Sequence, residues 1–181
     1  MDAGPMCDRL DILVNSHHTL FKQAEWLGLS GTHPRPAHCV PLVHGIDDTV
    51  AALWGVPRSD RSLHTHTHSA SDAQTATWRT GWKRCRGIIP VGGWWDHSWH
   101  ITGTGMHLAV LWEESGGVTH VVIVTQDAGT LAHRLDRSPI PLTEDGALKW
   151  IASGDFTDQV SDFSVVQEAF TGNENGTFFG V

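Results

Sequence analysis

Two apolar segments joined by a tight glycine turn constrain the fold of this chain more than any other feature. Residues 106–113 and 118–125 are rich in Val, Leu and Ile, and Ser115-Gly116-Gly117 lies between them. Aliphatic runs of this length around a Gly-containing turn are typical of a β-hairpin. Because both runs are apolar at most positions, both faces of the hairpin need cover. The sequence therefore predicts a central, buried hairpin over 106–125, with 94–102 as a further strand.

Helical patterns and caps outside the hairpin predict the elements that cover it. Ser16 and Thr143 can each cap a helix, and apolar residues then recur at helical spacing. Gly55 and Pro57 would end another helix. We therefore expect an α+β fold, in which an antiparallel sheet packs with three to four short helices. The expected helices cover residues 16–27, 47–54, 143–152 and 161–170.

The length of 181 residues fits one domain. Residues 1–9 are interpreted as an N-terminal arm. Residues 57–81 are polar, rich in Ser, Thr, His and Asp, and carry no helical stripe. We interpret them as a long polar loop or an edge ribbon within the single domain 1–181.

The charge pattern argues against nucleic acid and membranes as partners. The formal net charge is −8, and the longest basic cluster, residues 79–86, is short. No apolar run approaches the roughly 18 residues of a membrane helix. Three cysteines without a C-x-x-C pattern indicate a reducing compartment. We therefore expect a cytoplasmic protein, or a component of an assembled particle.

Our preferred interpretation of the function rests on the tryptophans. Trp94, Trp95 and Trp99 lie within six residues, and Trp78 and Trp82 have helical i, i+4 spacing. Tryptophan packs in cores, but it is also enriched at interfaces. We interpret these residues as a Trp-rich surface loop of a non-catalytic binding or assembly subunit. Its partner would be another protein or a second copy of the chain, in a homo-oligomer, a virion or tail particle, or an inhibitor complex.

His64, His66 and His68 alternate along the polar segment. On a strand, residues i and i+2 share a face about 6.6 Å apart, so two neighbouring imidazoles could hold one metal ion. One hypothesis is therefore a histidine-rich site for zinc or another divalent metal. The other is a polar ribbon without metal, in which case no cofactor is expected.

A third hypothesis comes from a resemblance. Gly117, His120 at the start of an apolar strand, and His133 follow the local Cys85-Arg86-Gly87. This order resembles the papain-like hydrolases of the NlpC and CHAP types. The resemblance implies a thiol-dependent amide or cell-wall hydrolase, with Cys85 as nucleophile, His120 as base and His133 as orienting group. The alternative is that His120 is an ordinary strand residue and Cys85 a buried small side chain.

Overall fold

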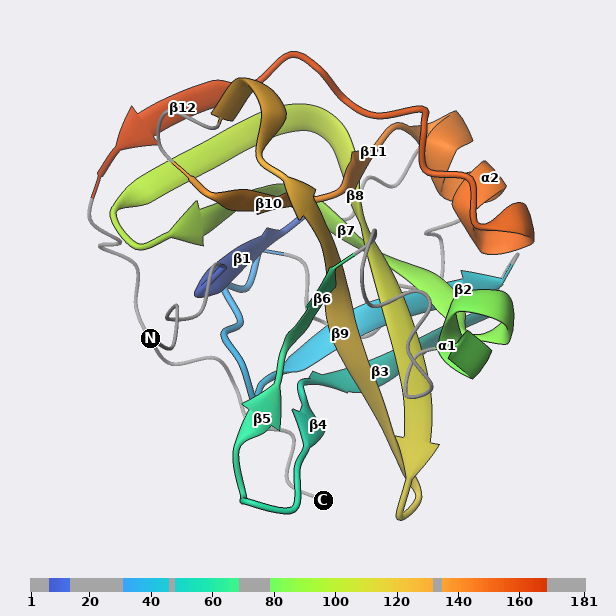
Figure 1. The fold of residues 1–181 in the computed structure, drawn as a ribbon. Helices are drawn as coiled ribbons and strands as arrows, with labels where there is room; N and C mark the ends of the chain where they lie inside the picture. Colours follow the sequence, from blue (N-terminus) through green and yellow to red (C-terminus); the bar gives the residue numbers. More distant parts are fainter. Residues whose placement is uncertain (1–6, 14–30, 46–47, 69–78, 132–134, 169–181) are drawn as a thin grey trace.

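A computed structural model describes residues 7–13, 31–45, 48–68, 79–131 and 135–168 (Figure 1). Strands dominate, and two α-helices occur in these ranges. The elements in chain order are β1 (Arg9–Ile12), β2 (Cys39–Gly45), β3 (Asp48–Trp54), β4 (Val56–Pro57), β5 (Leu63–His64), β6 (His66–His68), α1 (Arg79–Arg84), β7 (Arg86–Asp96), β8 (Trp99–Ser115), β9 (Val118–Asp127), a 3-10 turn (Gly129–Leu131), β10 (Arg137–Pro139), β11 (Pro141–Leu142), α2 (Glu144–Ser153) and β12 (Ser164–Gln167).

The main sheet closes on itself and is mixed. Strands pair in the order β7-β2-β3-β9-β8, and β8 pairs back onto β7 to complete the ring. The β3–β9 and β6–β9 pairs are parallel, whereas the other pairs are antiparallel. The expected α+β fold, an antiparallel sheet packed with three to four short helices, is therefore wrong. The molecule is mainly β, and its two helices pack on the outside of the curled sheet (Figure 1).

The predicted hairpin is confirmed. β8 and β9 pair antiparallel from Val110↔Ile123 to Ser115↔Val118. Gly116 and Gly117 form the two-residue turn with φ of 61° and 78°, values that glycine adopts without steric cost. Residues 106–111 of β8 and 120–125 of β9 are buried, whereas the residues beside the turn are exposed, so the inner part of the hairpin forms the centre of the core.

The predicted helix over 143–152 is also confirmed. It is α2, and the Thr143 hydroxyl caps it by accepting a hydrogen bond from the Gly146 amide at 3.0 Å. The helix ends at Gly154, whose left-handed φ of 82° is typical of a C-terminal cap. Trp150 on the inner face is fully buried and donates through Nε1 to the Gly87 carbonyl at 2.9 Å.

Two predicted helices are strands instead. Residues 48–54 form β3, which pairs along its length with β2. Residues 164–167 form β12, which pairs with residues 99–102 of β8. In both segments the apolar residues fit either period, and pairing with a distant strand decides the conformation. The expected helix over 16–27 lies outside the described residues.

The expected single strand over 94–102 is wrong as well. β7 ends at Asp96, His97 and Ser98 form a turn, and β8 starts at Trp99, which pairs back with Asp96. His97 has a positive φ of 53°. Such a turn carries no Gly, Asn or Asp at its two central positions, so the sequence shows no turn signal there.

Residues 57–81 were expected to form a long polar loop or an edge ribbon, and the described residues 57–68 of this segment contain short strands. β4 pairs with β5 in a separate two-stranded ribbon, while β6 joins the main sheet beside β9. No helix in the described ranges is long and apolar enough to cross a membrane.

Candidate functional site

The tryptophans of the expected surface loop lie mostly inside the molecule. Trp94 and Trp95 sit on β7, with exposed fractions of 0% and 6%. The Trp95 ring stacks on His100 with centroids 3.7 Å apart. Trp99 is half-buried on β8, and Trp78 lies outside the described residues. The segment that we interpreted as a surface loop is therefore two paired strands.

Trp82 has a packing role. It lies on α1, half-buried, and its ring meets Trp150 edge-on at 5.3 Å between centroids. It also meets Phe156 edge-on at 6.2 Å. These contacts attach α1 and the chain after α2 to the core.

The structure does not prepare Cys85 and His120 for nucleophilic chemistry. Burial raises the pKa of the Cys85 thiol, whereas a catalytic thiol needs a lowered pKa. His120 is buried on β9 and donates from Nδ1 to the Gly55 carbonyl at 2.9 Å. Strand β8 lies between the two residues, and two strand spacings separate backbones by about 10 Å. His133 lies outside the described residues.

The three alternating histidines belong to two different strands. His64 ends β5, which pairs with β4, while His66 and His68 lie on β6 beside β9. The chain changes partner at Thr65, so the i, i+2 spacing of one strand does not apply. The His66 ring meets Trp54 edge-on, and its burial lowers its pKa to about 4. In the part of the chain that the structure describes, no three His, Cys, Asp or Glu side chains group closely enough to hold a metal ion.

A cavity of about 390 Å³ lies between the end of the central hairpin and the chain that follows α2. The pocket is partly open, and its lining comes from β7, β9, the 3-10 turn, β10, β11 and the segment 157–163. The volume is in the range of small-ligand sites. The lining residues are Trp94, Gln126, Ala128, Gly129, Leu131, Ser138, Pro141, Thr157, Gln159, Val160, Ser161 and Phe163.

The lining is uncharged and mixed, with more apolar than polar surface. It contains two carboxamides, three hydroxyls and one indole, and no ionisable side chain belongs to the lining that the structure describes. Gln126 and Gln159 face each other and pair reciprocally. The Gln126 Nε2 donates to the Gln159 Oε1 at 2.6 Å, and the Gln159 Nε2 donates to the Gln126 Oε1 at 3.0 Å. Such a lining can hold a neutral molecule through hydrogen bonds.

The Trp94 indole packs beneath the pocket lining, and its Nε1 is buried. Its side chain is 0% exposed, and none of the described residues accepts a hydrogen bond from its Nε1. Phe163 meets the indole edge-on at 6.1 Å between centroids. Gly93 allows β7 to approach β8 closely next to Trp94, because a Cβ on residue 93 would lie 2.5 Å from the Ile101 carbonyl oxygen of β8.

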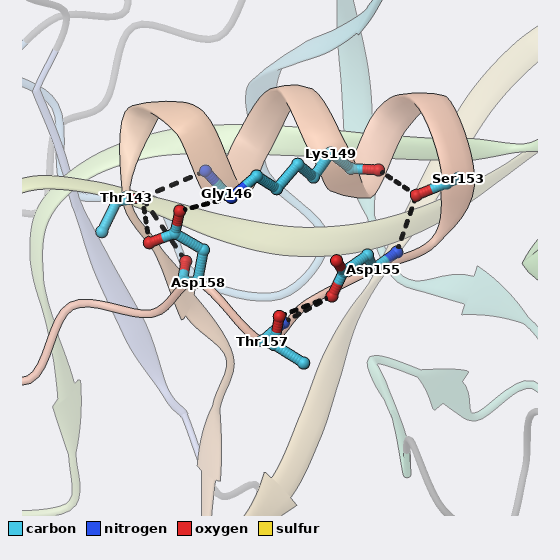
Figure 2. A network of polar contacts seen from close by, with 7 residues as sticks. All are labelled: Thr143, Gly146, Lys149, Ser153, Asp155, Thr157 and Asp158. Carbon is cyan, nitrogen blue, oxygen red and sulfur yellow. Dashed lines mark hydrogen bonds and ion pairs between the residues drawn. The ribbon is translucent and has the colours of Figure 1, made fainter.

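A polar network holds the cavity wall against the start of α2 (Figure 2). The Thr143 hydroxyl donates to the Asp158 Oδ1 at 2.9 Å, and the Thr143 amide donates to the Asp158 carbonyl at 3.2 Å. Lys149 reaches back along α2 to the Asp158 Oδ2 at 2.9 Å. The hydrogen bonds from Lys149 and Thr143 hold the pKa of Asp158 below its usual value. Because Gln159 follows Asp158 directly, this network positions one of the two cavity carboxamides.

The sequence indicated only one member of this site. Trp94 was among the candidate binding residues, but as part of an exposed surface. The two glutamines and the serines are common residue types without a motif, and they come from segments up to 35 residues apart. Only the fold brings them together.

Solved structures of other proteins share the fold of this chain. No protein-family model matches the chain, and no curated protein matches it. A solved structure of a protein from Bordetella bronchiseptica has a TM-score of 0.69 at 12% identity, covering 91% of this chain and 100% of its own. A protein from Bacteroides thetaiotaomicron has a TM-score of 0.67 at 15% identity, with 88% and 90% covered. A phage-related protein from Bordetella bronchiseptica has a TM-score of 0.64 at 16% identity, with 88% and 93% covered. At these identities, the similarity shows a shared fold.

Proposed function

We propose that this chain is a non-catalytic binding or assembly subunit, and that the cavity beneath residues 157–163 receives part of its partner. The observation that carries the proposal is an uncharged, partly open pocket whose lining combines apolar side chains with the paired carboxamides of Gln126 and Gln159. This proposal replaces the surface loop of tryptophans with a partly open pocket.

Two further observations support a binding role. Burial raises the pKa of the Cys85 thiol, and strand β8 separates Cys85 from His120, so the two groups do not form an activated pair. One structural neighbour is called phage-related. That name is in keeping with a place in an assembled particle, where binding to another protein or to a second copy is the usual task.

Thermal unfolding with a panel of small probes tests the proposal. The probes are N-acetyl-alanine methylamide, glucose and phosphate. A ligand that binds only the folded state stabilises it by RT ln(1 + [L]/Kd), about 1.4 kcal/mol at ten times Kd. For a chain of this size, Tm should rise by roughly 3–5 °C. We expect a rise with at least one of the two neutral probes and none with phosphate.

A variant at the cavity rim shows whether the response comes from this site. Ser161 is exposed and lines the cavity, so Ser161→Phe should narrow the entrance and abolish the rise in Tm. Ser164→Phe is the matched control, because Ser164 is exposed but does not line the cavity. The proposal fails if no neutral probe raises Tm, or if both variants respond like the unmodified protein.

A further inference from the structure

We propose that a proton held on Asp96 fastens the first strand, β1, to β7, so that β1 is held firmly in acid and opens more often as the pH rises toward neutral. Leu10 and Ile12 on β1 are fully buried, so the strand stays docked most of the time and the pH acts on the small open fraction. Opening would leave backbone groups of residues 93–95 on β7 unpaired. This inference does not rest on the proposed function, because it concerns a strand contact and not the cavity.

The strand register places two carboxylates opposite each other. β1 lies beside β7 (Figure 1), antiparallel to it and with Arg9 opposite Trp95. The same register continued by one residue places Asp8 opposite Asp96. Directly opposed residues have Cβ atoms about 4.5–5.5 Å apart, and like charges there are destabilising. Because side chains alternate between the two faces of a strand, both carboxylates lie on the face of Trp94, which belongs to the core.

Burial makes the ionised form of this pair costly. Asp96 has an exposed fraction of 4%, and Asp8 is half-buried. Burial is the main cause that raises the pKa of Asp96 to about 6, and the charge on Asp8 raises it further. Burial also raises the pKa of Asp8. In acid, Asp96 is therefore neutral beside Asp8, whereas at neutral pH two poorly hydrated like charges face each other.

The other charged groups around Asp96 do not cancel this repulsion. Asp136, just before β10, adds negative charge and raises the pKa of Asp96 as well. His97 lowers it, and its Nε2 lies 4.0 Å from the Asp96 Oδ1. The His97 side chain is 69% exposed, so water screens its charge. Histidine also loses its charge as the pH rises toward neutral, so the surroundings of Asp96 become more repulsive in the same direction.

Asp8 connects the carboxylate pair to the backbone contact between the strands. Its carboxylate accepts a hydrogen bond from the His97 amide, and its own amide donates to a β7 carbonyl at 3.0 Å. His97 and Arg9 attract the Asp8 carboxylate, whereas burial raises the pKa of the adjacent Cys7 thiol, which stays neutral. Repulsion between Asp8 and Asp96 therefore acts at the point where β1 begins to pair with β7.

The pKa of Asp96 sets the size of the effect. A neutral carboxyl favours the docked strand, and this contribution is lost as the pH rises through about 6. If opening of β1 returns Asp96 to its ordinary pKa of 3.8, the equilibrium constant for opening rises about tenfold between pH 5 and pH 7.5.

Hydrogen exchange followed by nuclear magnetic resonance tests the inference on the intact chain. The reporter is the Asp8 amide, which donates to the Trp95 carbonyl. After correction for the pH dependence of the chemical exchange step, its opening constant should rise about tenfold from pH 5 to pH 7.5. The Gly154 amide, which donates to the Trp150 carbonyl at the end of α2, is the local reference and should keep its opening constant.

A second reference separates opening of β1 from unfolding of the whole chain. The Trp112 amide donates to the Cys85 carbonyl at 2.9 Å and lies in the longest strand, β8. Opening of β1 alone should expose the Asp8 amide more often than the Trp112 amide at every pH. Equal opening constants for the two amides would mean that β1 leaves only when the protein unfolds, and this result overturns the inference.

Two variants assign the pH dependence to its source. Asp96→Asn has nearly the same size and cannot ionise, so the Asp8 amide should lose its tenfold change. Asp11→Asn is the matched control, because Asp11 lies on the opposite face of β1, where its Oδ1 lies 3.5 Å from the His33 Nε2. This variant should keep the change. If Asp96→Asn does not fold, Asp8→Asn removes the same repulsion and is followed through the amides of β1.

Three results contradict the inference. One is an opening constant of the Asp8 amide that does not change with pH. Another is an Asp96→Asn protein that keeps the tenfold change. The third is loss of the change in Asp11→Asn, which would assign the pH dependence to the ion pair between Asp11 and His33 instead.

Discussion

Replacement of Gly146 by alanine should destabilise the protein by forcing the cavity wall away from α2. A Cβ built on Gly146 would lie 2.0 Å from the Asp158 carbonyl oxygen, far inside van der Waals contact. The neighbouring atom belongs to the backbone, so it cannot turn aside as a flexible side chain can. The segment around Asp158 must therefore move by about 1 Å or more.

The magnitude follows from three contributions. Overpacking against a fixed neighbour typically costs 1–3 kcal/mol. The hydrogen bond from the Thr143 amide to the Asp158 carbonyl would be lost, at about 1 kcal/mol. Alanine gains about 1 kcal/mol over glycine inside a helix. The net destabilisation is about 1–3 kcal/mol, which for a chain of this size lowers Tm by roughly 4–8 °C at the middle of the range.

Calorimetry on two variants measures this effect. Gly116→Ala is the control, because a Cβ there meets open space and only the positive φ of 61° is strained, at about 1 kcal/mol. Gly146→Ala should lower Tm more than Gly116→Ala does and should weaken binding of the cavity probe, since Asp158 directly precedes Gln159. A Gly146→Ala protein as stable as the unmodified one would refute the close contact between α2 and residue 158.

Three further perturbations have defined outcomes. Burial raises the pKa of the Asp96 carboxyl to about 6 from 3.8, so its contribution to stability is full below about pH 4 and is lost as the pH rises through 6. At about 1.4 kcal/mol per pH unit this is about 3 kcal/mol, so Asp96→Asn should be the more stable protein in urea at pH 7.5 and should lose that advantage at pH 4. Burial lowers the pKa of His66 to about 4 from 6.5, so the stability of the protein depends on pH in the opposite direction. The contribution of His66 to stability is full above pH 6.5 and falls as the pH drops toward 4. His66→Phe should flatten that acid limb, and an unchanged limb would contradict the burial of this ring. Thr143→Ala removes the N-terminal cap of α2 and should cost about 1 kcal/mol by urea unfolding, with Thr143→Ser retaining most of it.

Elements with a local signal could be predicted from the sequence. The Gly116-Gly117 turn needs two left-handed residues, and this requirement is visible in the residue types themselves. The same holds for α2, where Thr143 and Gly154 mark both ends. In each case the physical cause acts within a few residues, so one sequence is enough.

Elements decided by distant partners could not be predicted. The segment 48–54 has an apolar pattern that also fits a helix, and it becomes a strand because β2 offers it a complete ladder. The same applies to β12, which pairs with β8 more than sixty residues earlier. The cavity could not be predicted for the same reason. Gln126 and Gln159 are distant in the sequence, and only the fold places them face to face.

The parallel contact between β3 and β9 has a consequence for how the chain reaches its native state. Leu53 pairs with His120, so this contact closes a loop of about 67 residues, whereas Ser115 and Val118 meet across a two-residue turn. Loop closure costs entropy that nearby contacts avoid, so long-range parallel pairing is slow. We expect the β8–β9 hairpin to gain protection first in pulsed hydrogen exchange, and the β3–β9 contact to complete the closure late, as the step that sets the refolding rate.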